Sequence, residues 1–342
     1  MSNIKIVGLG ALNIDNIYQV ERILGDGETA VDREHVERIP RYGEAELKWA
    51  GTFPGGSAAN TIYGLAKLGV STGFIGAVGD DAEGKILLQD FEKAGVDTGQ
   101  IKVKPKAKTG LALCLSDKLN FRKISVSRAT ANSLLAMNDI DLDYLNRAEV
   151  LHISSFVDDA QLEVLLELVG KLDSSVKISF SPGELYATKG ARTLTPILAR
   201  TYVLFINQNE MQQLTGKDFK AGAETCLKHG CEIVVVTLGK GTSWKTVMAT
   251  SYIRDSENEY IVEPGNKNVV SALDTTGAGD AFATGFLYGL LKGLGLKECG
   301  FLGDIAAQFS TTKMGAREGL PTLSELSQRY RELYNKELGI KE

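Results

Sequence analysis

The segment from Ala272 to Phe282 constrains this chain more than any other, because it joins an extended stretch to a helix through a glycine turn. Apolar residues after Asp280 recur at helical spacing, which predicts a helix with one buried face. Gly277, Ala278 and Gly279 then fall at the helix amino terminus, where unpaired backbone N–H groups and the helix dipole favour an anion. Since glycine has no Cβ, the backbone can approach that anion closely. The turn therefore predicts an anion-binding loop.

The carboxylate of Asp280 directly follows this loop, although a bound anion would repel it. The placement suits a base that takes a proton from a hydroxyl while the loop holds developing negative charge. Together, these two tasks describe the transfer of a phosphoryl group to an alcohol. The alternative is a purely structural helix cap, since Asp and Gly are common at helix amino termini. The preceding Asp274-Thr275-Thr276 makes that alternative weaker.

Composition limits the classes of protein that remain. The 342 residues are 43% hydrophobic and 24% charged, which fits one large α/β domain or two small ones. A net charge of -5 gives no broad basic field, so nucleic acid is not an expected partner. No signal-peptide pattern follows Met1, and no apolar run reaches about 18 residues, so we expect a cytoplasmic protein without membrane contact.

The cysteines are scattered along the chain. Cys226 and Cys231 lie on either side of His229, which leaves a metal site open as an alternative. Cys114 and Cys299 add no ligand at a suitable spacing. We therefore expect reduced thiols, as is usual in the cytoplasm.

The first strand pattern runs from Ile4 to Leu9 and continues into a second glycine, Gly10. A dinucleotide-binding fingerprint would need a third glycine at position 13 and a helix directly after it. Asn13 stands there, and the following residues have an extended pattern. A nicotinamide-dependent oxidoreductase is therefore a weaker alternative.

From Val150 onward, strand patterns alternate with helical patterns such as Leu162 to Leu172. This alternation predicts a parallel sheet with helices on both faces and ligands at the carboxyl ends of the strands. Residues 21–50 lack a clear period and are expected to be irregular with some strand. Leu111 to Leu115 and Phe121 to Val126 are expected to form a hairpin.

Two motifs resemble the signatures of a known family. The string from Asp274 to Phe282 resembles the second signature of the PfkB family, the ribokinase-like sugar and nucleoside kinases, and the string from Phe53 to Asn60 resembles the first. The resemblance implies an α/β protein with a three-layer α/β/α ribokinase-like fold, a mostly parallel central sheet and a small β-sheet lid. It also implies a single kinase domain over residues 1–342, with lid segments inserted at about 12–55 and 100–130.

The resemblance implies a role for each matched residue. The family's catalytic base corresponds to Asp280, and its anion hole corresponds to the backbone of Gly277, Ala278 and Gly279. A carboxylate can accept two hydrogen bonds from a diol, which suits the acceptor site. The residues implied to bind the acceptor are Asp15, Gly55, Gly56 and Asn60.

The resemblance also implies that the kinase uses ATP and Mg²⁺. Thr237, Gly239 and Gly241 correspond to the family's nucleotide loop and are assigned to ATP, although the second glycine comes one residue early. Asn207 and Glu210 resemble the family's Asn-x-x-Glu motif and are implied to hold Mg²⁺ mostly through water, since Mg²⁺ prefers oxygen ligands and retains waters. These two residues also fit a helix capping box, and both roles can hold together.

The acceptor is defined less well. Ribokinase has Lys-Gly where this chain has Ser57-Ala58, and a glutamate where it has Ser154-Ser155-Phe156. These departures argue against ribose and slightly favour a nucleoside, followed by a free sugar and then a sugar phosphate. In some family members a monovalent cation binds near the loop that corresponds to Asp274, and the sequence leaves open whether one binds here.

Three further alternatives remain. A cluster of cations near the predicted hairpin could meet a phosphate, although edge-strand charge that prevents aggregation is the favoured interpretation. The chain could also be a non-catalytic sugar or nucleoside sensor on the same fold. Homodimerisation through the lid is a third option that the sequence leaves open. The cations in question are Arg122, Lys123 and Arg128.

Overall fold

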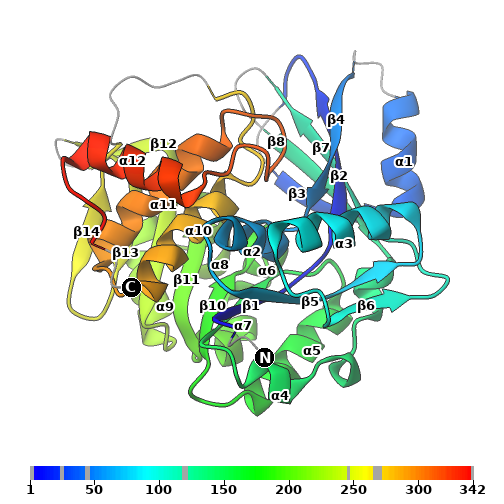
Figure 1. Ribbon diagram of the computed structural model, residues 1–342, viewed down its shortest axis with the longest axis horizontal. Coiled ribbons are helices and arrows are strands. Elements are labelled where there is room, and N and C mark those ends of the chain that lie inside the picture. The colour runs from blue at the N-terminus through cyan, green and yellow to red at the C-terminus, as the bar shows by residue number, and fades with distance from the viewer. Residues whose placement is uncertain are drawn as a thin grey trace.

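The computed structural model describes residues 4–23, 27–42, 47–117, 122–244, 247–264 and 272–339. Its large sheet has nine strands in the order β14-β13-β12-β11-β10-β9-β1-β5-β6 (Figure 1). All neighbouring pairs from β12 to β6 are parallel, whereas β12–β13 and β13–β14 are antiparallel. The mostly parallel central sheet is therefore confirmed. Its strands are β1 (Ile6–Leu9), β5 (Thr72–Gly79), β6 (Ile101–Lys104), β9 (Val150–Ser154), β10 (Lys177–Ser181), β11 (Thr201–Asn207), β12 (Ile233–Trp244), β13 (Val247–Arg254) and β14 (Glu259–Val262).

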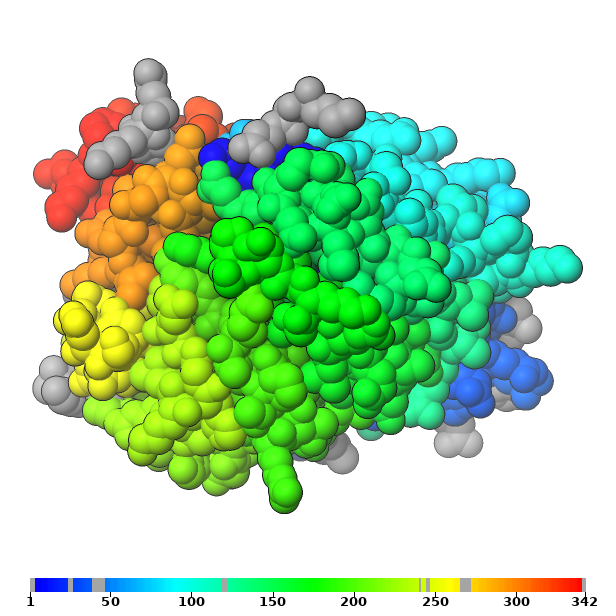
Figure 2. Space-filling model, turned by 90° about the horizontal axis from the view of Figure 1, so that it is seen from below, coloured from blue at the N-terminus to red at the C-terminus, as the bar shows by residue number. Residues whose placement is uncertain are grey.

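Helices cover both faces of this sheet and enclose two hydrophobic cores (Figure 1). One face carries α2 (Ser57–Lys67), α3 (Ala82–Ala94), α10 (Ala278–Leu291) and α11 (Leu296–Ser310), with α12 (Leu323–Tyr334) packed on α11. The other face carries α4 (Leu142–Leu145), α5 (Asp159–Lys171), α6 (Gly183–Ala187), α7 (Gly190–Leu198), α8 (Gln208–Thr215) and α9 (Phe219–Lys228). In Figure 2, the green to yellow-green part of the chain forms most of the surface seen from below. The arrangement is the predicted three-layer α/β/α fold.

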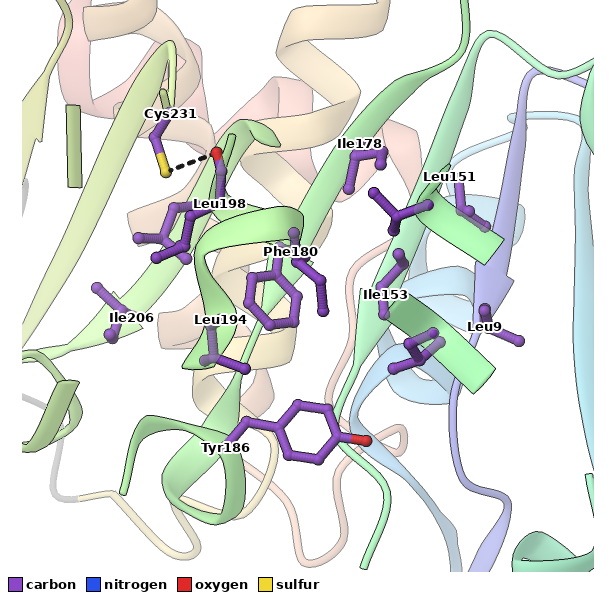
Figure 3. Close-up of a cluster of buried hydrophobic side chains, with 14 of the residues drawn as sticks. Leu9, Leu151, Ile153, Ile178, Phe180, Tyr186, Leu194, Leu198, Ile206 and Cys231 are labelled. Carbon is purple, nitrogen blue, oxygen red and sulfur yellow. Dashed lines mark hydrogen bonds between the residues drawn. The ribbon is translucent and has the colours of Figure 1, made fainter. Parts of the chain in front are cut away.

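The core on the second face shows why these strands are nearly continuous apolar runs. Side chains of β1, β9 and β10, among them Leu9, Leu151 and Phe180, point into the space beneath α6 and α7 (Figure 3). Strands of a parallel sheet that is covered on both faces must be apolar on both sides. Each fully buried side chain of this size contributes about 1.5–3 kcal/mol. On the α7 side the thiol of Cys231 donates to the carbonyl oxygen of Leu198 at 3.5 Å.

A second, five-stranded sheet has the order β3-β8-β7-β2-β4 and lies beside the large one (Figure 1). The predicted hairpin is confirmed, because β7 and β8 pair in antiparallel register; its turn at 118–121 lies outside the described residues. That this sheet acts as a lid stays a prediction. Its strands are β2 (Asn13–Gln19), β3 (Gly27–Asp32), β4 (Lys48–Gly55), β7 (Gly110–Ser116) and β8 (Arg122–Arg128).

The expectation of irregular structure in residues 21–50 was wrong in one respect, because α1 (Arg33–Tyr42) forms there. The helix packs on the second sheet and buries Val36, while Arg33 pairs with Glu37 one turn later at 2.9 Å. A short helix of this length gains most of its stability from tertiary packing, and this one has few apolar residues that would indicate a buried helix from sequence alone.

Strand β12 continues through the glycine turn and ends at Trp244. Its pairing with β13 shifts register between Thr237 and Thr242, which marks an irregularity of the β-bulge kind. Gly239 and Gly241 inside it have φ of 60° and 106°, a region that favours glycine. The β12 backbone thereby changes direction where its parallel pairing with β11 ends, on the side of the sheet where ligands bind in such folds.

Candidate active site

Asp280 lies in the first turn of α10, and Gly277 is the residue that precedes this helix. Gly277 has a φ of 74°, and a Cβ there would lie 2.5 Å from the Cβ of Ala316. A larger residue at 277 would therefore be strained in its backbone and in its packing. Within this turn the N–H of Ala278 donates to the carbonyl oxygen of Thr275 at 3.2 Å, whereas the N–H groups of Gly279 and Asp280 precede the first bond of the helical ladder, from Ala281 to Gly277, as an anion site requires.

Asp274 stabilises the loop before α10 through hydrogen bonds to the backbone. Its side chain is 1% exposed, and its two oxygens accept hydrogen bonds from the backbone N–H groups of Thr276 and Gly315, both at 2.9 Å. The carboxylate thus joins the loop before α10 to the turn after α11. This structural role leaves open whether a monovalent cation binds near Asp274, which stays a prediction.

The carboxylate of Asp280 is bound by the amino end of α2. The Ser57 hydroxyl donates to Oδ1 at 2.7 Å, and the Asn60 amide nitrogen donates to Oδ2 at 2.9 Å. Burial raises the pKa of Asp280 to about 6, against the hydrogen bonds from Asn60 and Ser57, which lower it. A carboxylate with this pKa is mostly ionised at neutral pH and still basic enough to accept a proton.

Asp15 lies on β2 and is buried beside Gly55 and Gly56, the first glycine loop, which precedes α2. A Cβ at Gly55 would come within 2.2 Å of both carboxylate oxygens, and a Cβ at Gly56, where φ is 101°, would lie 2.1 Å from the carbonyl oxygen of Ala11. Burial raises the pKa of Asp15 to about 7, while the charge of Arg317 lowers it. The structure thus places all four predicted acceptor residues around α2.

The predicted nucleotide residues lie at neighbouring strand ends. Asn207 is opposite Thr237 in the parallel register of β11 and β12. The predicted capping box is present, because Asn207 Oδ1 accepts from the Glu210 N–H at 2.9 Å and Glu210 Oε2 accepts from the Asn207 N–H at 3.0 Å. Burial raises the pKa of Glu210 to about 7.

Charge connects these groups into one site. The negative charge of Asp280 contributes to the raised pKa of Asp15, of Glu210 and of Glu28, a residue of β3 in the second sheet. Burial is the main cause of the rise in the pKa of Glu28 to about 8. The N–H of Glu28 donates to Glu184 Oε2 at 2.6 Å, so the second sheet reaches across to α6.

Two cations lie at this site: Arg317, which sequence reasoning missed, and Arg122, for which it gave a phosphate-binding role only as the weaker alternative. Arg317 makes contacts with the first glycine loop that are described below. Arg122 donates from Nη1 to the carbonyl oxygen of Thr275, in the loop before α10, at 2.7 Å. The preferred interpretation of Arg122, Lys123 and Arg128 as edge-strand charge was wrong, because β8 lies between β3 and β7. The adjacent Lys123 and Arg128 are exposed.

Some imidazole, aromatic and thiol side chains belong to the core and not to the site. His152 and Phe156 are buried in the core at 0% and 2% exposure, and burial lowers the pKa of His152 to about 3. Within the described ranges, all cysteines are buried and free, and no His, Cys, Asp or Glu cluster could hold a metal. In the same part of the chain, no helix is both long and apolar enough to cross a bilayer.

The sequence matches the model of the pfkB family carbohydrate kinases over residues 20–323. The chain therefore belongs to this family, and it is an ATP-dependent kinase of the sugar and nucleoside class. A protein of Archaeoglobus fulgidus described as an uncharacterized sugar kinase is 38% identical over 75% of this chain and 98% of its own length. The ribokinase of Staphylococcus aureus is 28% identical over 95% of this chain and 99% of its own length.

Solved structures agree in fold. The adenosine kinase of Sinorhizobium meliloti has a TM-score of 0.82 at 22% identity, covering 96% of this chain and 99% of its own. A probable sugar kinase of Rhizobium etli has a TM-score of 0.82 at 24% identity with the same coverage of both chains, 96% and 99%. At this level of identity the likeness establishes the ribokinase-like fold and leaves the acceptor open.

Proposed function

We propose that this protein transfers the γ-phosphoryl group of ATP to an alcohol of a nucleoside or sugar, with Asp280 as the general base. One observation carries the proposal. The Asp280 carboxylate lies directly after the glycine turn of α10, and the Ser57 and Asn60 side chains, at the amino end of α2 after Gly55-Gly56, donate hydrogen bonds to its two oxygens. The base thus lies where an acceptor held by one loop would meet a phosphoryl group held by the other.

The chemistry divides between the two loops. Asp280 takes the proton of the attacking hydroxyl, so that the oxygen carries enough electron density to displace ADP from the γ-phosphorus. The backbone of Gly277, Ala278 and Gly279 stabilises the negative charge that spreads over the transferring group. Because the carboxylate is held by two donors, it approaches the hydroxyl without a reorganisation cost.

The nucleotide side fits ATP and Mg²⁺. The side-chain oxygens of Asn207 and Glu210 accept one backbone N–H each and retain lone pairs for waters around a metal. Mg²⁺ would neutralise the phosphate charge when it is bound. Thr237, Gly239 and Gly241 are proposed to contact ATP in the part of β12 where its parallel pairing with β11 ends.

The acceptor side supports a polyol. Asp15, Gly55, Gly56 and Asn60 are proposed to orient it, with Asp15 accepting hydrogen bonds from two of its hydroxyls. A nucleoside is the favoured acceptor, before a free sugar. The Phe156 ring is packed in the core and is therefore not available to stack on an acceptor.

One observation keeps a sugar-phosphate acceptor in consideration. Arg122 lies against the loop before α10, and its charge lowers the pKa of Asp280. A cation at that position could bind a phosphate of the acceptor or of ATP. The cytoplasmic location and a homodimer formed through the second sheet also stay predictions.

The test is Mg²⁺-dependent ADP release from ATP across nucleosides, free sugars and sugar phosphates, with Asp280→Asn as the inactive control. We expect one strong response that names the acceptor class and disappears in the control. ATP binding without turnover on any acceptor would instead support a non-catalytic sensor.

A further inference from the structure

Arg317 is a buried cation that directly follows the turn of Gly315 and Ala316. It is 4% exposed, although a guanidinium is costly to remove from water. Its nitrogens have three different acceptors: Nε donates to Asn60 Oδ1 at 2.9 Å, Nη2 to the carbonyl oxygen of Gly55 at 3.1 Å, and Nη1 to Asp90 Oδ2 at 2.5 Å.

Two aromatic rings complete the surroundings of this guanidinium. Its Cζ lies 5.2 Å from the ring centroid of Tyr63 and 5.0 Å from that of Phe91. Such contacts stabilise a cation through the negative electrostatic potential of the ring face. Arg317 is therefore held firmly by α2 and α3, and its orientation follows from the fold.

The contact with Asn60 has a chemical consequence, because an amide has an accepting end and a donating end. A guanidinium can donate but not accept, so the Asn60 oxygen must face Arg317. The amide nitrogen of Asn60 then faces the other way, and it donates to Asp280 Oδ2 at 2.9 Å. All hydrogen bonds from Arg317 through Asn60 to Asp280 thus donate in the same direction, toward the carboxylate.

We propose that Arg317 is a positioning residue for the phosphoryl transfer: through Asn60, it holds the Asp280 carboxylate in its reactive orientation. This inference rests on the proposed role of Asp280 as the base. Arg317 does this without touching Asp280, and the same guanidinium binds the backbone of Gly55 beside Asp15. One side chain thus aligns the base and the acceptor loop together.

Loss of Arg317 would release the Asn60 amide. The amide could then turn its oxygen toward Asp280, so that the carboxylate would lose a donor and meet a partial negative charge. Its base form would become less stable, and its pKa would rise. The positive charges of Arg122 and Arg317 lower the pKa of Asp280. In turn, the negative charge of Asp280 raises the pKa values of Asp15, Glu28 and Glu210.

The experiment compares the pH dependence of kcat in the full-length enzyme and in Arg317→Gln, with ATP and the acceptor found in the panel. We expect kcat to fall about tenfold or more. We also expect the acid limb of the profile to move upward by about half a pH unit or more, with little change in KM for ATP. Arg317→Lys, which can still donate to Asn60, should restore part of both effects.

Asp90→Asn is the matched control, because it weakens the ion pair of Arg317 but leaves its bonds to Asn60 and Gly55. We expect a lower melting temperature with an unchanged acid limb. If Arg317→Gln does not fold, the paired change Arg317→Met with Asp90→Leu replaces the ion pair by apolar groups, an exchange that buried pairs often tolerate. It should reproduce the shifted limb.

A double-mutant cycle separates the positioning role from general damage. The effect of Arg317→Gln on kcat should shrink in an Asn60→Ala background to the part that comes from the direct charge of Arg317 on Asp280, since the rest acts through Asn60. An undiminished effect there, or an equal limb shift in Asp90→Asn, would overturn the positioning role. Near-normal turnover of Asp280→Asn would instead overturn the proposed function itself, so the two failures are distinguishable.

Discussion

The two glycine loops of the site are alike in sequence but differ in what surrounds them. In the first loop, a Cβ at either glycine would overlap existing atoms, the carboxylate of Asp15 at Gly55 and the carbonyl oxygen of Ala11 at Gly56. In the second loop, Gly277 is equally crowded, whereas a Cβ at Gly279 would meet no atom within 4 Å. The first loop is therefore filled by the protein itself, and the second leaves space at a helix amino terminus. This difference agrees with the proposed roles: side chains around the first loop would bind the acceptor, and backbone N–H groups of the second loop would bind the phosphoryl group.

The largest expected effect lies where the two loops meet. Asp280→Asn keeps the size of the side chain but removes the base, so kcat should fall about 10²–10⁴-fold. ATP affinity should stay within about twofold, because the backbone of the loop is unchanged. Steady-state kinetics and ATP titration by calorimetry measure the two quantities. Near-normal turnover would exclude Asp280 as the base.

Gly55→Ala tests the filled loop. The new Cβ would lie within 2.2 Å of the Asp15 oxygens, so the carboxylate must move. We expect KM for the acceptor to rise about tenfold or more, with a smaller change in KM for ATP. An equal loss for both substrates would contradict the assignment of this loop to the acceptor.

Gly279→Ala tests the open loop, with Gly277→Ala as its contrast. Because nothing lies near the added methyl group at 279, thermal stability should be unchanged, while kcat/KM for ATP should fall about tenfold if a phosphate uses that space. Gly277→Ala, at a φ of 74° and against Ala316, should lose about 1–3 kcal/mol of unfolding free energy as well. Full activity in Gly279→Ala would show that no ligand occupies the space.

The smallest effect concerns stability and pH on the acceptor side. The pKa of Asp15 is about 7 in the folded protein against an ordinary value of 3.8, so its contribution to stability is present at low pH and is lost as pH rises toward 7. Asp15→Asn has no such loss. Its unfolding free energy relative to the unsubstituted protein should therefore increase by about 2 kcal/mol between pH 5 and pH 8, while acceptor binding weakens. Parallel pH curves from urea unfolding would contradict this.

Local signals were enough for much of the fold. The helical pattern predicted from Leu162 to Leu172 corresponds to α5 (Asp159–Lys171), and α8 begins with the predicted capping box. Helical period, strand period and capping all depend on residues a few positions apart, so they can be recognised without knowing the fold. The α1 helix was missed because its apolar face has meaning only against the second sheet.

The sequence by itself determined the alternation of strands and helices after Val150, the glycine turn before α10 and the position of Asp280 directly after that turn. Tertiary structure alone decided which groups surround that carboxylate. Asn60 is 220 residues from Asp280 in the chain, and Arg317 is 257 residues from Asn60. No local period relates residues so far apart. Their contact depends on how α2 and α10 pack on one face of the sheet, and on a guanidinium whose burial becomes favourable only when its acceptors and rings are all in place.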